Sequence, residues 1–256
     1  MNNSIQVLVS TMKGRALERK SFDAPEFLIV DQLSPHVTPV RRGHYISSTV
    51  GLSASRNEAI DCATGDIVLF ADDDVQHIDG FIDVIKHEFE RTGADVITFQ
   101  IETPDGCAFK NYSPVGFRHN LRTLMRVNSI EIAVRRSSLL EKSLRFDEQF
   151  GLGARFPTGE EVIFLADALR SGLVLQYCPV PIVIHPKESS GSNLFRNKSL
   201  ILAKGAMLSR IFRWSAPIVC VVFAVRHYKK SGYSFFGFWG ILLEGLAALL
   251  FERFRR

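Results

Sequence analysis

Residues 65–75, GDIVLFADDDV, decide the fold, because an apolar run at 67–71 leads directly into three consecutive carboxylates. Buried strands of parallel sheets read as continuous apolar runs, and ligands of α/β proteins bind beyond the carboxyl ends of such strands. We therefore predict a central strand that delivers Asp72, Asp73 and Asp74 to a ligand crevice. Side chains alternate along an extended backbone, so Asp72 and Asp74 are expected to point one way and Asp73 the other.

Two carboxylates on one side of a strand end suit a hard divalent cation. Magnesium or manganese held by one or two carboxylates usually completes its shell with water and substrate phosphates. The alternative for any Asp-Asp-Asp sequence is a solvated acidic turn. The apolar strand before the acids and the helix-stop sequence ATGD at residues 63–66 favour the cation site.

Apolar periodicity around this stretch predicts an alternation of strands and helices. That alternation indicates an α/β fold with a mostly parallel sheet. Residues 13–20 are expected to form a short helix or a loop, and residues 100–140 read as a looser insertion with several basic residues, of the kind that shapes substrate specificity. The predicted strands are 5–10, 27–30, 67–71 and 94–99, and the predicted helices are 51–63 and 81–91.

Two polar residues near these elements are candidates for ligand binding. Asp31 follows the second strand, where an acid can hold a ribose or a base, or simply cap the next element. Arg56 lies near the start of the first helix, and its planar donors suit a phosphate or a base edge. Solvation at the surface is the alternative for Arg56.

The segment after residue 145 adds a second group of candidates. Thr158 is expected to cap a helix that runs to Arg170, with Glu161 three residues on completing a capping box. Short strands are predicted at 173–177 and 182–184, and the second delivers His185 at its end. A single histidine before proline is more often structural than a ligand.

Charge is distributed unevenly along the 256 residues. Residues 1–185 carry a net charge of −5 and residues 186–256 one of +9. A basic, aromatic C-terminal segment beside an acidic body indicates an anionic surface as partner. Nucleic acid is one such partner, but the apolar runs of this segment favour a membrane.

The cysteines and the N-terminus indicate a reducing compartment. The four cysteines are far apart in sequence and form no C-x-x-C pair, which argues against a disulfide framework or a zinc site. The first residues, MNNSI, have no basic region before an apolar core and do not read as a signal peptide. We therefore expect the cytoplasm.

Two apolar runs in the C-terminal segment are candidates for membrane contact. Residues 214–225 would form a helix of about 18 Å, and residues 233–251 one of about 28 Å, against a hydrocarbon core of about 30 Å. We expect helices that lie in the interface on the cytoplasmic side of the membrane. A short transmembrane hairpin and burial against a partner subunit are the alternatives. The residues expected at the apolar boundary are Phe235, Phe236, Phe238 and Trp239.

Taken together, these residues resemble the family 2 glycosyltransferases, which are inverting enzymes with the GT-A fold. The matching sequences occur in the order of the family over about residues 5 to 186. They are the first strand ending at Ser10-Thr11, Val30-Asp31, Ser55-Arg56-Asn57, Ala63-Thr64-Gly65-Asp66 before Asp72-Asp73-Asp74, Gly159-Glu160-Glu161, and His185-Pro186.

The resemblance implies a role for each matching position. Thr11, Asp31 and Arg56 would hold the nucleotide. Asp72 and Asp74 would bind the metal and the diphosphate, and Asp73 would take part in binding the ribose or the base. His185 resembles a histidine that completes the metal shell in some relatives. The general base of the family corresponds to Glu161, with Glu160 as a competitor. The first strand lacks the proline and the tyrosine-asparagine that usually follow it.

The resulting hypothesis is a metal-dependent glycosyltransferase, using Mg or Mn, with a GT-A domain at 1–190 and membrane-associating helices at 191–256. It would transfer a sugar from a nucleotide donor, UDP by resemblance, to a lipid-linked or glycan acceptor, with residues 194–256 on the membrane and no nucleic acid partner. One alternative is a nucleotidyltransferase, whose usual phosphate loop the residues 10–15 match poorly. Another is a non-catalytic membrane-bound scaffold with this fold, against which the acid pairs argue.

Overall fold

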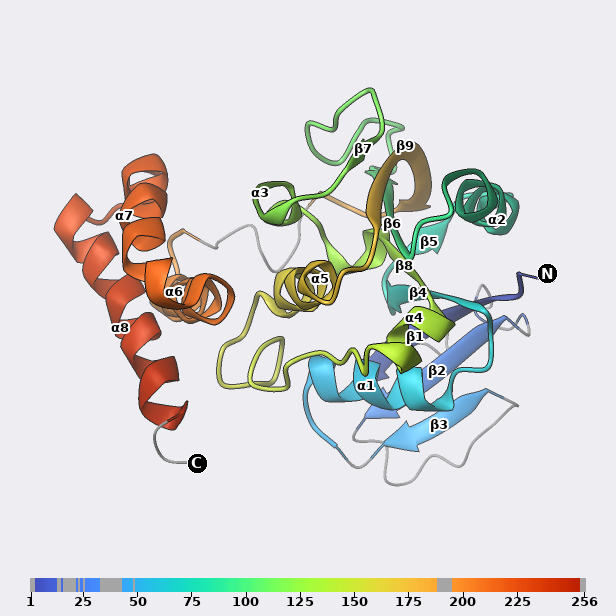
Figure 1. Ribbon diagram of the computed structural model, residues 1–256, viewed down its shortest axis with the longest axis horizontal. Coiled ribbons are helices and arrows are strands. Elements are labelled where there is room, and N and C mark those ends of the chain that lie inside the picture. Colours follow the sequence, from blue (N-terminus) through green and yellow to red (C-terminus); the bar gives the residue numbers. More distant parts are fainter. Residues whose placement is uncertain are drawn as a thin grey trace.

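The computed structural model describes residues 3–12, 15, 22, 24, 26–32, 43–47, 49–187 and 195–253. Most of the predicted helix or loop at 13–20 and the predicted domain boundary at 190/191 lie outside these residues. A twisted sheet with helices on both faces makes up one part of the molecule (Figure 1). The last three helices gather on one side of it, with a helix of the α/β part between them and the sheet.

The sheet is mixed, and most of its described strands run in one direction. β1, β2, β3, β4, β6 and β9 are parallel to one another, whereas β5, β7 and β8 run the opposite way. The order is β3-β2-β1-β4-β8-β6-β9-β5, with β7 paired to β9. The strands are β1 Ile5–Met12, β2 Phe27–Gln32, β3 His44–Ser47, β4 Ile67–Asp72, β5 Gln76–His77, β6 Val96–Glu102, β7 Phe117–Arg118, β8 Ile132–Arg135 and β9 Leu175–Ile184.

The strand predicted from the opening stretch is central, as expected. β4 lies between β1 and β8, and its first five residues are buried. Val7 and Leu69 face one apolar cluster, while Leu8 and Phe70 face the other. Because both faces of this strand are covered, none of its side chains faces water, which explains the unbroken apolar run.

Three details of the predicted sheet are wrong. β8 falls within the segment interpreted as a loose insertion, yet it pairs with both β4 and β6 in the centre of the sheet. The two short strands predicted after residue 172 are a single strand, β9. Asp31 lies inside β2 and pairs in register with Thr11, so it does not follow the strand end.

Helices of the α/β part cover the two faces of the sheet. Ile85 and Phe89 of α2 pack in the first apolar cluster, whereas α1 and α5 contribute to the second. These helices are α1 Leu52–Cys62, α2 Phe81–Thr92, α3 Leu121–Leu124, α4 Arg136–Glu141 and α5 Glu160–Arg170, with a 3₁₀ turn at Ser129–Glu131.

The predicted capping box at the start of α5 is not formed. The residue before the helix is Gly159, with φ of 99°, and no side chain caps the helix. A left-handed backbone at that position favours glycine, and it moves Thr158 out of the cap. Glu161 is therefore not held by a capping box.

The C-terminal helices form a third apolar cluster together with α5. Val162, Ile163 and Ala166 of α5 share it with residues of all three helices. Gly205 of α6 and Gly245 of α8 let the two backbones come close, because a Cβ at either position would collide with a main-chain carbonyl of the other helix. The helices are α6 Lys198–Phe212, α7 Ala216–His227 and α8 Phe235–Arg253, with 3₁₀ turns at Arg213–Ser215 and Tyr228–Lys230.

By length and composition, one helical run, Lys198–Lys230, is long and apolar enough to cross a membrane, which is weak evidence by itself. Its backbone turns at Arg213, where φ is 51°, so α6 and α7 are separate helices of 15 and 12 residues. At 1.5 Å per residue they extend about 22 and 18 Å, short of the roughly 30 Å core. The expectation that Phe238 faces a membrane is wrong, because its side chain is buried among the helices.

Candidate active site

A cavity of about 520 Å³ lies at the carboxyl ends of β1 and β4. Its walls come from the strand ends, from α1, from the segment 128–130, from the start of α5 and from α6. It is of the size that proteins use for small-molecule ligands. The site residues predicted from the sequence that line it are Thr11, Arg56, Asp72, Asp73, Asp74, Glu160, Glu161 and His185.

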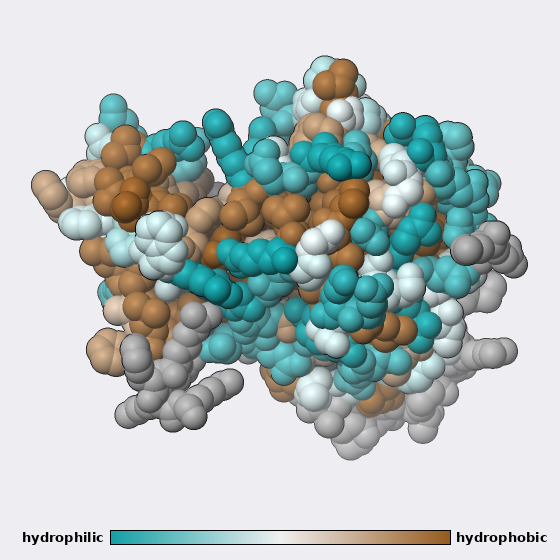
Figure 2. Space-filling view, in the orientation of Figure 1, coloured by the Kyte–Doolittle hydropathy of each residue, from teal (hydrophilic) through white to brown (hydrophobic). Residues whose placement is uncertain are grey.

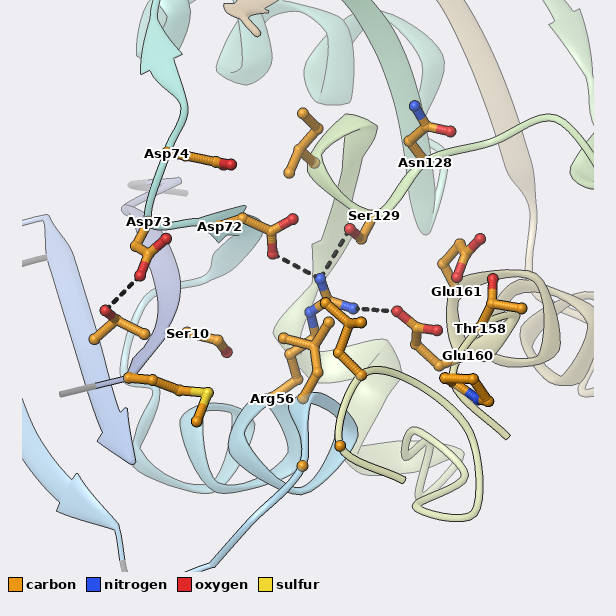
Figure 3. Close-up of a pocket in the computed structure, with 18 of the residues that line it drawn as sticks. Ser10, Arg56, Asp72, Asp73, Asp74, Asn128, Ser129, Thr158, Glu160 and Glu161 are labelled. Carbon is orange, nitrogen blue, oxygen red and sulfur yellow. Dashed lines mark hydrogen bonds and ion pairs between the residues drawn. The ribbon is translucent and has the colours of Figure 1, made fainter. Parts of the chain in front are cut away.

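The three acids at the end of β4 point in two directions, with Asp72 the last residue of the strand and Asp73 and Asp74 in the turn that follows it. Asp72 and Asp74 point into the same side of the cavity, and Asp73 points away from them toward β1 (Figure 3). Thr11 Oγ1 donates a hydrogen bond of 2.7 Å to Asp73 Oδ2. One side of the strand end thus presents the carboxylates of Asp72 and Asp74. On the other side, the hydrogen bond of Asp73 links the turn after β4 to β1.

Arg56 is buried at the floor of the cavity and connects its two acidic walls. Its side chain is 1% exposed. Its guanidinium donates to Asp72 Oδ1 at 2.8 Å, to Ser129 Oγ at 2.8 Å and to Glu160 Oε1 at 3.1 Å (Figure 3). The neighbouring carboxylates raise the pKa of Arg56 against the opposing effect of burial, so the group is a permanent cation. Desolvation raises the pKa of Asp72, and Arg56 opposes that rise.

His185 follows β9 and faces Asp74, with 3.5 Å between Nε2 and Oδ2. Its Nδ1 lies 2.6 Å from the Pro186 carbonyl oxygen and donates to it, which leaves Nε2 on the side of Asp74. The hydrogen bond to Asp74 raises the pKa of His185. A histidine whose Nδ1–H is held by a backbone carbonyl has the arrangement common among metal ligands.

The residues fit a cation that takes few ligands from the protein. Asp72 and Asp74 face one space, which matches the one or two carboxylates that magnesium usually receives. Within the described ranges, no group of three His, Cys, Asp or Glu side chains is arranged to hold a metal ion. A closed, protein-only cage does not fit this site, whereas a cation shared with phosphate oxygens and water does.

Glu160 and Glu161 open α5 and differ in their surroundings. Glu160 is buried and bound by Arg56. Glu161 lines the cavity without a described ion pair, and Figure 3 shows its carboxylate directed into the open space. Burial and the adjacent Glu160 raise the pKa of Glu161 to about 8. Such a group exchanges a proton near neutral pH.

Asp31 lies apart from the cavity. Its side chain is 0% exposed, and His44 Nε2 lies 3.8 Å from its Oδ2. It is not among the lining residues, although its strand neighbour Thr11 is. The structure thus brings together the other sequence-predicted residues and leaves Asp31 beneath the surface.

Two parts of the wall were not anticipated from the sequence. Asn128, Ser129 and Ile130 come from the presumed insertion, and no local signal marks them as site residues. Leu200 comes from α6, in the segment interpreted as a membrane helix. A single charged residue, Lys204, within the apolar stretch of α6 was the available signal for that helix, since an isolated charge in an apolar segment usually has a partner.

The mixed sheet, the helices on both of its faces and the acidic cavity at the strand ends define a GT-A-like α/β protein. Residues 27–149 match the family model described as glycosyl transferase family 2. This segment is therefore similar to the family 2 glycosyltransferases, the family that the motifs indicated. No curated protein matches the chain.

Solved structures similar to the chain include S. aureus TarS. The crystal structure of TarS 1-349 in complex with UDP-GlcNAc aligns with a TM-score of 0.60 at 14% identity, over 95% of this chain and 83% of that one. A longer TarS chain aligns with a TM-score of 0.56 at 15% identity, over 90% of this chain. The chain spans only 44% of that longer protein. At such identities the likeness shows the fold, and the predicted fold class is confirmed.

Proposed function

We propose that this protein is a cation-dependent, inverting glycosyltransferase that moves a sugar from a UDP-sugar to a hydroxyl group of a lipid-linked or glycan acceptor. The observation that carries this proposal is a single cavity walled by Asp72 and Asp74 on one side and by Glu161 on the other. The UDP-GlcNAc complex of the similarly folded TarS 1-349 supports the donor class.

Asp72 and Asp74 are the residues that would hold the cation, and His185 lies beside Asp74. Bound there, the cation would neutralise the charge that develops on the departing diphosphate. Arg56 supports this arrangement because it holds the Asp72 carboxylate in place. Magnesium and manganese are the cations suited to such an oxygen-rich site.

Thr11 and Asp73 form the part of the wall where the nucleoside would bind. They lie on the other side of the strand end from Asp72 and Asp74, hydrogen bonded to each other. Their polar groups suit a ribose or a base edge. Arg56, whose Nη1 and Nη2 donate to protein acceptors, fits a positioning role better than direct nucleotide contact. The role of Asp31 rests on the resemblance alone.

Glu161 is the residue that we assign as general base, in preference to Glu160. It accepts the proton of the acceptor hydroxyl while the acceptor oxygen bonds to the anomeric carbon. The bond between that carbon and the diphosphate oxygen breaks, and the diphosphate keeps the electron pair. Glu160 is bound to Arg56 and is less available for this step. A carboxyl with a pKa of about 8 is suited to proton transfer near neutral pH.

A thermal-shift titration with UDP tests the donor and cation site. We expect UDP with Mn²⁺ to raise the melting temperature more than either alone, because a ligand that binds only the folded state stabilises it. Asp74→Asn should remove the Mn²⁺-dependent part of the shift. The matched control is Asp79→Asn, an exposed acid in the following loop that does not line the cavity.

Two results would contradict the donor assignment. One is an equal shift with ADP, GDP and UDP whether or not Mn²⁺ is present. The other is an Asp74→Asn variant whose Mn²⁺-dependent shift equals that of Asp79→Asn. The sugar is then identified by release of UDP from a panel of UDP-sugars.

The exposed side of α7 supports the proposed membrane partner. Its apolar side chains recur at helical spacing and gather on one side of the molecule (Figure 2). Basic side chains lie exposed at both ends of the helix, at Arg213 and at Arg226, Lys229 and Lys230. Apolar residues flanked by cations suit an anionic lipid surface. We define this α7 face as Trp214, Ile218, Val221, Val222 and Val225.

Vesicle co-sedimentation tests the α7 face on the full chain. We expect binding to vesicles that contain phosphatidylglycerol, weaker binding to pure phosphatidylcholine, and loss of binding in Ile218→Asp. Leu140→Asp, at an exposed apolar position of α4, is the control and should bind like the parent protein. Unchanged binding by Ile218→Asp would exclude this face. Binding would place the protein at the membrane, and we propose the cytoplasmic side.

A further inference from the structure

Helix α6 carries a buried lysine toward the candidate active site. Lys204 is 8% exposed, and its described hydrogen-bond partner is Met207 Sδ at 3.6 Å, a weak acceptor. Leu200, one turn earlier on the same helix face, lines the cavity. Burying an ammonium group costs free energy unless a negative charge compensates it. A carboxylate is therefore expected near Lys204.

The packing of α6 brings Lys204 to the first turn of α5. A Cβ added to Gly159 would lie 2.8 Å from both Cγ and Sδ of Met207, so these two helices are in close contact. Gly159 immediately precedes Glu160 and Glu161. Lys204 lies one turn before Met207 on α6, and both glutamates attract its charge. The close approach of Gly205 to α8 fixes α6 from its other side.

Other charged groups also act on Glu161 or Lys204. Glu160 adjoins Glu161 on α5, Arg56 reaches from α1, and Lys110 approaches from the segment after β6. Arg56 is bound to Asp72 and Glu160, and Lys110 lies 2.6 Å from Glu131. On the side of Lys204, His227 of α7 is the additional titratable group.

Among the three cations near Glu161, only Lys204 has no carboxylate within 4.0 Å in the described part of the chain. Its charge is therefore the one most available to Glu161. Burial lowers the pKa of Lys204 and raises that of Glu161, and each group opposes the shift of the other. These two pKa shifts are expected for a buried lysine and a buried glutamate, each of which stabilises the charged form of the other.

We propose that Lys204 is a positioning residue for sugar transfer, whose charge favours the ionised form of Glu161, the form that accepts the acceptor proton. The C-terminal helices are then part of the active site as well as a membrane-facing unit. This inference rests on the proposed function, because it assumes that Glu161 is the base. Lys204 itself touches no reacting atom. Once Glu161 has taken the proton, the uncompensated charge of Lys204 favours release of that proton to water.

The first test compares the pH dependence of kcat/KM in Lys204→Met and in the parent protein. Methionine has an unbranched side chain close to the length of lysine and removes the charge. We expect the acidic limb of the profile to move to higher pH by about one unit, which is a roughly tenfold loss on that limb. Raising the pH should restore the parental rate. The control is Lys198→Met on the same helix, where the lysine is exposed and pairs with Glu244 at 3.2 Å.

A purely structural role predicts a different result. If Lys204 only packs, Lys204→Met changes the rate by the same factor at every pH, and high pH does not rescue it. That outcome overturns the proposal, as does a profile identical to that of Lys198→Met.

The second test needs no transferase activity. Melting temperatures of the parent protein, Lys204→Met, Glu161→Gln and the double variant form a cycle that measures the coupling of the two side chains. A carboxyl whose pKa is raised on folding makes stability fall as pH rises from its unfolded pKa, near 4.3, to its folded pKa, about 8. Lys204→Met should deepen this fall, but only when Glu161 is present. Coupling should vanish below pH 4, where Glu161 is protonated in both states.

The two tests separate the two claims. Absence of transfer with every UDP-sugar, together with coupling in the cycle, refutes the proposed function and leaves the charge pair intact. Transfer without coupling between the two positions at pH 8 refutes the role of Lys204 and leaves the function standing.

Discussion

The two walls of the cavity hold their acidic residues in different ways. At the sheet edge, short contacts of the β-strand ends fix the acids: Asp72 binds Arg56, Asp73 binds Thr11, and Asp74 lies beside His185. At the helical wall, Glu161 has no described ion pair within 4.0 Å and depends on burial and on charges farther away. The sheet edge is suited to holding a fixed charge, whereas the helical wall is suited to exchanging a proton.

The largest expected effect is the difference in kcat between substitutions of Glu161 and Glu160, the two glutamates of the helical wall. Glu161→Gln removes the proposed base and should lower kcat by about 10²–10⁴-fold, the usual contribution of general base catalysis. Glu160→Gln keeps a hydrogen-bond acceptor for Arg56 and should cost less in kcat. Steady-state rates at saturating donor measure both. A larger loss in Glu160→Gln than in Glu161→Gln would reverse the assignment.

Removal of the arginine that joins the two walls should have the largest effect on stability. Arg56→Met leaves the Asp72 and Glu160 carboxylates without their cation, and breaking a buried pair in this way costs about 3–5 kcal/mol of unfolding free energy. Urea unfolding followed by circular dichroism measures it. Arg145→Met, which breaks an exposed pair with Asp61, should cost no more than about 1 kcal/mol. Equal costs would mean that the buried network adds no stability.

A smaller effect is expected where α8 holds α6 against the catalytic part. A Cβ at Gly245 would lie within 2 Å of the Leu202 carbonyl oxygen, so Gly245→Ala forces the helices apart at a cost of about 1–3 kcal/mol. Because α6 carries Leu200 and Lys204, kcat should fall as well.

Gly240→Ala is the matched control on the same helix, with nothing within 4 Å of its new Cβ. It should stabilise the protein by about 1 kcal/mol, since alanine favours helix over glycine. Activity that survives Gly245→Ala unchanged would show that the helical wall does not depend on this contact.

The sheet edge could be predicted from sequence because its signals are local. The apolar run before three acids predicted β4 and the divergence of Asp73 from Asp72 and Asp74, and both are observed. Asp73 and Asp74 lie in the turn after β4, so their directions agree with the prediction although the strand itself ends at Asp72. The site roles of these residues and the division into two domains stay predictions.

Predictions that depended on longer-range pairing were less successful. β8 was missed because its four residues, between a 3₁₀ turn and α4, are too short to show a period. Asp31 was placed at a strand end, but pairing with β1 extends β2 past it. The capping box was wrong because the left-handed Gly159, packed against Met207, sets the start of α5.

The sequence by itself determined the resemblance to the family and the central strand with the acids at its end, because apolar runs and motifs act within a few residues. Only the tertiary structure decided that Arg56 links Asp72 to Glu160 across the cavity, and that α6, with Leu200 and Lys204, packs beside Glu161 instead of lying wholly in a membrane. These contacts join residues far apart in the chain. They arise from the burial of apolar surface and from the need to compensate buried charge, which no local pattern encodes.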